Sequence, residues 1–119
     1  MTEKKYKWVK LAEGIHELDF GPNNLLETQA GGKRICLVRT QEGIAACGAK
    51  CPHAGGQLSE GFLDQKEALV CPIHRYRFDL KTGRDLTGEG YYLKIYPVRQ
   101  DETGIFVGIP EGGVLGWLK

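Results

Sequence analysis

Two short loops of the sequence each contain a cysteine, a proline and a histidine. Cys51 and His53 are spaced C-x-H in "CPHAGGQLSEG", and Cys71 and His74 are spaced C-x2-H in "CPIHRYRFD". Thiolates and imidazoles together bind zinc or iron–sulfur clusters. Seventeen residues (54–70) separate His53 from Cys71, which is enough for a hairpin that brings the loops side by side. The spacing therefore predicts a metal site with two ligands from each loop.

Three interpretations of these pairs follow from general chemistry. A lone cysteine or histidine on a strand is most often part of the core, but two matching clusters make coincidence a poor explanation. Structural zinc sites usually pair cysteine with cysteine and histidine with histidine, although a mixed Cys2His2 zinc site stays open. In a mixed-ligand [2Fe–2S] centre, two cysteines bind one iron and two histidines bind the other. Each loop then supplies one ligand to each iron, which explains the matching pairs.

The two loops closely resemble the cluster loops of the Rieske family. "CPHAGGQLSEG" resembles the family's C-x-H-x-G-x-x-L-S-x-G loop, and "CPIHRYRFDLKTG" resembles its C-P-x-H-G-W-x-F-D-x-x-T-G loop, over about residues 51–83. The resemblance implies a Rieske-type [2Fe–2S] cluster, one per chain. Cys51 and Cys71 would bind the inner iron. His53 and His74 would bind the outer iron through Nδ1 and lie near the surface.

The resemblance also implies roles for residues around the ligands. Gly55 and Gly56 would let the backbone approach the cluster sulfides, where N–H groups tune the potential. Leu58 would shield the cluster from water, and Phe78 would pack beneath the second loop.

This chain departs from high-potential members of the family in both loops. Those proteins carry an extra cysteine in each loop, joined as a disulfide, where this chain has Gly56 and Ile73. They also carry a serine and a tyrosine that hydrogen-bond to cluster sulfurs, at the places of Tyr76 and Phe78. Because phenylalanine has no donor, the resemblance implies a potential at the low end of the Rieske range, roughly −150 mV.

Two further departures concern the backbone near the site. Arg75 stands where the family often has a glycine, and we expect an arginine to resist a positive φ, so that the local backbone differs. "LTGEG" at 86–90 stands where many relatives have a proline-rich segment, and its glycines predict a looser cover over the cluster.

The remainder of the chain has the pattern of β-structure. Turn signals recur about every ten residues, as in sandwiches and barrels. Gly31-Gly32 indicates a two-residue hairpin, and turns are also predicted at 64–66 and 101–103. The predicted strands are 5–13, 14–20, 25–30, 33–40, 44–49, 76–83, 91–100 and 104–110. We therefore expect an all-β, Rieske-type antiparallel β sandwich or barrel with a small cluster-binding subdomain.

The bulk composition fits one domain of ordinary size. The chain has 119 residues, 41% of them hydrophobic, and a net charge of +1, which does not favour nucleic acid or an acidic membrane as a partner. We expect a single Rieske domain over 1–119, with cluster-binding loops at about 48–83 inserted in a β base. The charged N-terminus is unlike a signal peptide, and no stretch has the roughly 18 apolar residues of a membrane span. A cytoplasmic location follows as the default.

The remaining cysteines and the third histidine receive no metal in this interpretation. Cys36 and Cys47 are expected to be small buried hydrophobic residues. A cluster bound by all four cysteines would leave both loop histidines unexplained. His16 lies on a predicted strand and is assigned no role.

An electron carrier is the expected function. Rieske oxygenases activate oxygen at a separate iron held by two histidines and a carboxylate. The chain has only three histidines, and the cluster uses two. The resemblance therefore implies a low-potential ferredoxin, similar to the ferredoxin component of ring-hydroxylating dioxygenases, that carries electrons from a flavin-dependent reductase to a terminal oxygenase or another redox protein. Lys50, Arg75 and Arg77 flank the loops and would face an acidic partner. The alternatives are the small subunit of an assimilatory nitrite reductase and a zinc-stabilised binding module.

Overall fold

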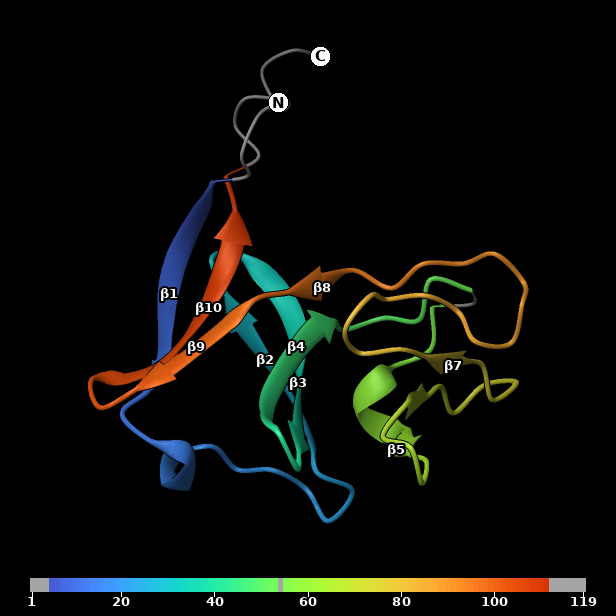
Figure 1. The fold of residues 1–119 in the computed structure, drawn as a ribbon, viewed down its shortest axis with the longest axis horizontal. Helices are drawn as coiled ribbons and strands as arrows, with labels where there is room; N and C mark the ends of the chain where they lie inside the picture. Colours follow the sequence, from blue (N-terminus) through green and yellow to red (C-terminus); the bar gives the residue numbers. More distant parts are fainter. Residues whose placement is uncertain (1–4, 54, 112–119) are drawn as a thin grey trace.

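The described part of the chain forms three antiparallel sheets (Figure 1). The structure is a computed structural model, and residues 1–4, 54 and 112–119 of the predicted 1–119 domain lie outside its described part. The first sheet has the order β1-β10-β9, formed by Tyr6–Ala12, Gly104–Pro110 and Val98–Asp101. The second has the order β2-β3-β4-β8, formed by Leu25–Ala30, Lys33–Thr40, Gly43–Gly48 and Ile95–Tyr96. The third has the order β5-β6-β7, formed by Phe62–Leu63, Leu69–Val70 and Arg77–Phe78.

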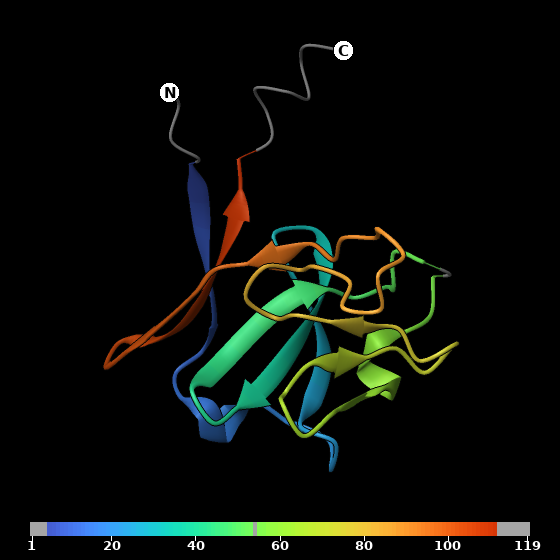
Figure 2. The same ribbon diagram turned by 45° about the vertical axis from the view of Figure 1, so that its right-hand side comes forward.

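Figures 1 and 2 place the second sheet between the other two. Strand β3 accordingly contributes to two hydrophobic cores. Ile35 and Leu37 pack toward the first sheet, in the core that also contains Val107 and Ile109. Cys36 and Val38 instead belong to the core that contains the loop cysteines. Because successive side chains of a strand point to opposite faces, a strand covered on both sides needs a continuous apolar run.

Several predicted turns are confirmed, and their chemistry explains them. Gly31 and Gly32 have φ values of 57° and 78° and join β2 to β3. Positive φ at both central residues is the requirement of a type I′ hairpin turn. The carboxylate of Asp64 accepts hydrogen bonds from the N–H groups of Lys66 and Ala68, which closes the turn between β5 and β6.

The small sheet is tied to the rest of the molecule by short polar contacts. A 3₁₀-helix, η2, at Leu58–Glu60 precedes β5. The side-chain amide of Asn23 donates to the carbonyl oxygens of Ser59 at 2.9 Å and Gly61 at 3.0 Å. Leu58 N–H donates to the carbonyl of Ala49 at 2.9 Å. These bonds hold the first loop against the base of the fold.

The predicted strand at 14–20 is wrong. Ile15–Glu17 forms a 3₁₀-helix, η1, with N–H groups bonded to carbonyls of Gly14 and Ile15. The Glu17 carboxylate also accepts a hydrogen bond from the N–H of Glu13 at 2.8 Å. Bonds to chain neighbours therefore take the place of a strand ladder.

The predicted strands at 76–83 and 91–100 are shorter than expected. Strand β7 ends at Phe78, because the carboxylate of the next residue, Asp79, accepts hydrogen bonds from the N–H groups of Lys81 and Thr82 and turns the chain. Pro97 divides the second segment into β8 and β9, which lie in different sheets. Proline has no N–H for a ladder bond, so the chain passes from one sheet to the other at this point.

Among the described residues, no helix is long and apolar enough to cross a membrane.

Candidate metal centre

Each Cys-Pro-His loop is closed by hydrogen bonds of its own backbone. Cys51 follows β4, and its N–H donates to the carbonyl of Gly56 at 2.8 Å, while its carbonyl accepts from Gly55 N–H at 2.8 Å. Cys71 follows β6, and its N–H donates to the carbonyl of Tyr76 at 2.8 Å. The two cysteines therefore begin tight loops whose later residues return to them.

The two thiols lie inside the protein. Cys51 is 2% exposed and Cys71 is fully buried. Burial raises the pKa of the Cys71 thiol to about 11; the neighbouring Cys51 thiol adds to this, and the N–H of Ile73, which donates to Sγ at 3.4 Å, opposes it. Metal ions bind thiolates and displace this proton.

The two imidazoles lie at the outer side of the loops. Nδ1 of His74 and Nε2 of His53 are 3.4 Å apart, and the ring centroids are 5.0 Å apart. His74 is exposed, whereas His53 is half-buried. Nδ1 of His53 is buried and has no hydrogen-bond partner. A buried nitrogen without a partner is costly, and a metal ion would satisfy it.

The structure thus pairs the two loop thiols, which are buried, and pairs the two loop imidazoles, which lie nearer the surface. This arrangement fits a binuclear cluster, in which each iron takes two protein ligands. In the part of the chain that the structure describes, no three or more His, Cys, Asp or Glu side chains gather where they could hold one metal ion.

Of the residues expected around the ligands, Leu58, Phe78 and Gly56 lie beside the loop cysteines, whereas Gly55 is exposed and no atom of the described residues lies within 4 Å of its Cβ position. Leu58 and Phe78 are fully buried in the core that contains both loop cysteines. A Cβ atom on Gly56 would lie 3.2 Å from Sγ of Cys71 and 2.9 Å from Cδ1 of Ile73. Gly56 and Ile73, the positions of the disulfide in high-potential relatives, therefore face one another across the two loops.

The expectation that Arg75 resists a positive φ is wrong. Arg75 has φ of 59°, and His74 before it has φ of 63°. The short closure between Cys71 and Tyr76 needs this reversal of the chain. Left-handed backbone costs an L-residue about 1–2 kcal/mol, so the loop contains local strain.

Two aromatic residues contact His53, and neither contact was predicted from the sequence. The ring of Tyr76 stacks on the His53 imidazole with centroids 3.9 Å apart and an interplanar angle of 13°. Tyr91 meets the same imidazole edge-on at 5.4 Å and 72°. Tyr76 stands at the tryptophan position of the second-loop motif, but it was singled out only because it replaces the serine of high-potential relatives. Tyr91 is far from His53 in sequence, and no spacing rule points to it.

Asp85 organises the segment that carries Tyr91, and the sequence did not single it out. The residue is 4% exposed, and its carboxylate accepts hydrogen bonds from Thr87 N–H, the Thr87 hydroxyl and Glu89 N–H. Its own N–H donates to the carbonyl of Tyr91 at 3.2 Å. Burial favours the neutral acid, but these hydrogen bonds outweigh it and lower the pKa of Asp85. The glycine-rich segment is thus arranged around a buried carboxylate.

The other cysteines and the third histidine are not part of the site. Cys36 and Cys47 are fully buried, as the sequence predicted, and they lie opposite one another on β3 and β4. The hydrogen bond to Cys36, together with burial, raises the pKa of the Cys47 thiol. His16 is exposed on η1, not on a strand.

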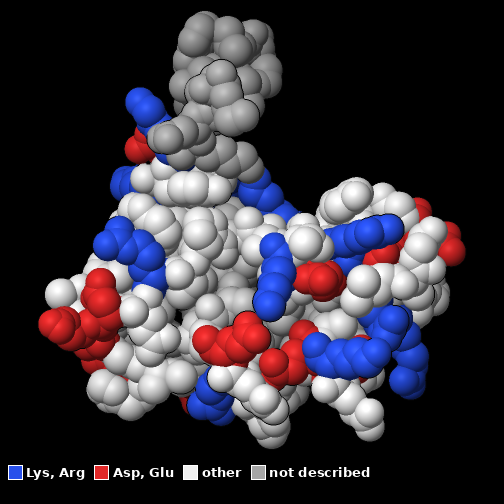
Figure 3. All heavy atoms as spheres, viewed as in Figure 1, with Lys and Arg blue, Asp and Glu red and all other residues white. Residues whose placement is uncertain are grey.

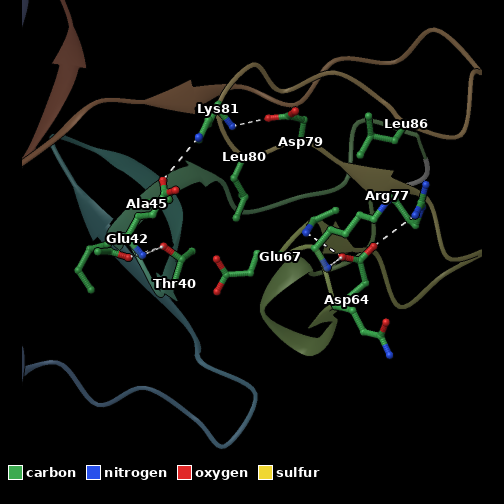
Figure 4. A pocket seen from close by; sticks show the side chains of 15 residues that line it. Thr40, Glu42, Ala45, Asp64, Glu67, Arg77, Asp79, Leu80, Lys81 and Leu86 are labelled. Atoms are coloured by element: carbon green, nitrogen blue, oxygen red, sulfur yellow. Dashed lines mark hydrogen bonds and ion pairs between the residues drawn. The ribbon is translucent and has the colours of Figure 1, made fainter.

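Basic and acidic side chains alternate over the face shown in Figure 3. Lys50, Arg75 and Arg77 are exposed, as expected for residues flanking the loops. Arg77, however, pairs with Asp64 at 3.3 Å. Both line a pocket of about 900 Å³ between the β3–β4 turn and the small sheet (Figure 4). Neither His53 nor His74 lines this pocket, so the pocket is separate from the candidate metal site.

Comparison with known proteins agrees with the geometry. Residues 7–93 match the Rieske [2Fe-2S] domain. The ferredoxin component of a naphthalene 1,2-dioxygenase system from Pseudomonas aeruginosa is 32% identical over 108 residues, which span 90% of this chain and 97% of that protein.

Two solved structures share the fold. The ferredoxin of carbazole 1,9a-dioxygenase from Nocardioides aromaticivorans IC177 has a TM-score of 0.69 at 21% identity and covers 92% of this chain and 100% of its own. A structure described as an NADH-dependent nitrite reductase small subunit from Mycobacterium tuberculosis has a TM-score of 0.72 at 23% identity. The match covers 91% of this chain and 97% of that one. The matched domain, the relative and the shared fold lead to one conclusion: the chain belongs to the Rieske [2Fe–2S] family, and a [2Fe–2S] cluster is its cofactor.

Proposed function

We propose that this chain is a Rieske ferredoxin, which receives single electrons from a reductase and passes them to an oxygenase or a similar acceptor. The observation that carries this proposal is the imidazole pair of His53 and His74 at the outer side of a site whose thiols are buried. An electron carrier needs a redox centre that is shielded from water and still close to the surface.

In this proposal Cys51 and Cys71 hold the inner iron, and His53 and His74 hold the outer iron. The [2Fe–2S] cluster, when bound, supplies a centre that gains and loses one electron. Leu58 excludes water on the inner side, since it is fully buried beside both cysteines. His74 is exposed and therefore gives a docked partner the shortest approach to the site.

The chain itself would act as the carrier and not as the oxygenase. Use of His53 and His74 as ligands leaves His16 as the one other histidine of the sequence. A mononuclear oxygen-activating iron needs two histidines and a carboxylate. Such a site would have to lie on the partner.

The partners in this proposal are a flavin-dependent reductase and a terminal oxygenase, acting in the cytoplasm. The similar proteins named above as ferredoxin components support the oxygenase. A structure of 23% sequence identity, described as a complex of reduced oxygenase and oxidized ferredoxin in carbazole 1,9a-dioxygenase, shares the fold. The exposed Lys50 and Arg75 would meet acidic side chains on the partner.

The second candidate is the small subunit of an assimilatory nitrite reductase. The fold of the nitrite reductase small subunit noted above favours it. Isolation in a stable assembly with a large flavoprotein would support this candidate. A chain that purifies alone and exchanges partners would support the ferredoxin.

The test is anaerobic purification followed by absorption and EPR spectroscopy, first oxidised and then reduced with dithionite. We expect a red-brown protein whose reduced form has the Rieske signal, with a lower average g value than all-cysteine ferredoxins. Cys71→Ala should lose the signal. Cys47→Ala is the matched control, because it also removes a fully buried thiol of the same core and should keep the signal. A colourless protein with one bound zinc would refute the proposal.

A further inference from the structure

The environments of the two outer histidines differ. His53 is half-buried, and His74 is exposed. Two tyrosine rings contact His53, whereas the one aromatic contact of His74 among the described residues is with His53 itself. The protein thus surrounds one imidazole and leaves the other open.

Tyr76 links the second loop to a histidine of the first. Its carbonyl accepts the N–H of Cys71 at 2.8 Å, so its backbone belongs to the second loop. Its ring lies nearly parallel to the His53 ring, with an angle of 13° and centroids 3.9 Å apart. A stack in this geometry restricts rotation of the imidazole about its bond to Cβ.

Tyr91 completes the contact from a third segment. It meets His53 at 5.4 Å and Tyr76 at 5.7 Å, in both cases edge-on. The hydrogen bond from Asp85 N–H to the Tyr91 carbonyl, together with those that the Asp85 carboxylate accepts, positions this residue. The three rings therefore come from three separate loops and touch one another pairwise.

We propose that Tyr76 and Tyr91 are positioning residues that clamp the His53 imidazole with its buried Nδ1 directed to the iron. This inference rests on the proposed function for the identity of the metal group. The buried and unpartnered Nδ1 shows which edge of the ring is held inward. Groups that fix the orientation of a ligand histidine adjust both metal affinity and the electronic state of the metal. Among the described residues, no tyrosine ring holds His74 in this way.

The clamp predicts different chemical reactivity for the histidines. We would treat the cluster-loaded, full-length protein with diethyl pyrocarbonate and map modified histidines by peptide mass spectrometry. His16, exposed on η1, is the internal reference. We expect His53 to react more slowly than His74. Tyr76→Leu should raise the reactivity of His53 roughly 2- to 12-fold, the factor that corresponds to the stacking energy of such ring pairs. Tyr76→Phe keeps the ring and should leave the reactivity unchanged.

The matched control is Tyr92→Leu. Tyr92 adjoins Tyr91 in sequence, is 67% exposed, and makes no described ring contact with His53. Tyr92→Leu should leave the reactivity of His53 with diethyl pyrocarbonate unchanged, whereas Tyr91→Leu should raise it. Equal reactivity of His53 in wild type, Tyr76→Leu and Tyr91→Leu would overturn the clamp.

A second measurement does not depend on the cluster. In the full-length apoprotein, the stacked Tyr76 ring should shift the His53 ring protons upfield in the NMR spectrum. This shift should persist in Tyr76→Phe and disappear in Tyr76→Leu. If it is absent from a wild-type apoprotein whose circular dichroism shows the folded β structure, the clamp is wrong even when the loaded protein has the Rieske EPR signal. If it is present while the EPR signal is absent, the clamp holds and the proposed function fails.

Discussion

Gly61, at the end of η2, is a position where an added methyl group should harm the metal-binding half of the molecule. Its φ of −86° suits any residue, so space alone decides the outcome. A Cβ atom there would lie 1.9 Å from the carbonyl oxygen of Val70 and 3.2 Å from that of Leu58. Ordinary contact begins near 3.4 Å, so the Val70 backbone would have to move by about 1.5 Å. Val70 directly precedes Cys71, and the displacement would therefore reach this proposed ligand.

The expected cost follows from the nature of the atoms involved. Overpacking that flexible side chains can absorb costs about 1–3 kcal/mol. Both neighbours of this Cβ are backbone atoms, so we expect Gly61→Ala to cost about 3–5 kcal/mol. For a chain of this size, that loss lowers the melting temperature by roughly 10–20 °C. The assay is thermal unfolding followed by circular dichroism, with visible absorbance of the cluster recorded in parallel.

Gly32→Ala is the matched control. Gly32 has a positive φ of 78°, but no atom lies within 4 Å of its Cβ position. Its substitution therefore tests backbone strain without a clash, at about 1–2 kcal/mol. The reasoning fails if Gly61→Ala unfolds at the same temperature as Gly32→Ala or above it.

Three further predictions concern the same half of the molecule. Asn23→Ala removes two part-buried hydrogen bonds to the η2 segment and should cost about 1–3 kcal/mol in denaturant unfolding; no change would mean that water replaces the amide. Gly56→Ala should lower the iron content per chain, because the new Cβ meets Cys71 Sγ at 3.2 Å; a full complement of iron would show that the loops yield. Asp85 has a pKa lowered by its hydrogen bonds, so its carboxylate stabilises the fold above the unfolded pKa of about 3.9 and loses this effect as the pH falls through the folded pKa. Asp85→Asn should therefore melt below the wild type at pH 7, and the difference should shrink below about pH 4; a gap independent of pH would contradict this.

Local signals in the sequence were sufficient for the turns and for the two loops that carry the proposed ligands. The glycines at 31 and 32 require a hairpin because few other residues adopt two positive φ values in succession. The two Cys-Pro-His loops identify themselves because the ligand types and their spacing are local properties. Ile105, Val107 and Ile109 alternate in the sequence, and all three are buried in β10.

The parts that were not predicted depend on contacts between distant segments. Tyr91 reaches His53 only because Asp85 shapes the intervening segment, and a buried carboxylate with backbone partners has no sequence signature. Arg75 accepts a positive φ because closure of the loop by Cys71 and Tyr76 outweighs the preference of one residue. Residues 14–20 have the apolar spacing of a strand but bond to their own neighbours.

The position of β3 between two cores has a consequence for protein engineering. Even-numbered positions of this strand, Cys36 and Val38, face the metal-binding half, and odd-numbered positions, Ile35 and Leu37, face the β base. Volume changes at the first pair should alter cluster retention and redox behaviour, whereas changes at the second pair should alter the folding of the scaffold. One strand of eight residues thus offers two separate sets of sites for design, and a library that varies one set can leave the other property untouched.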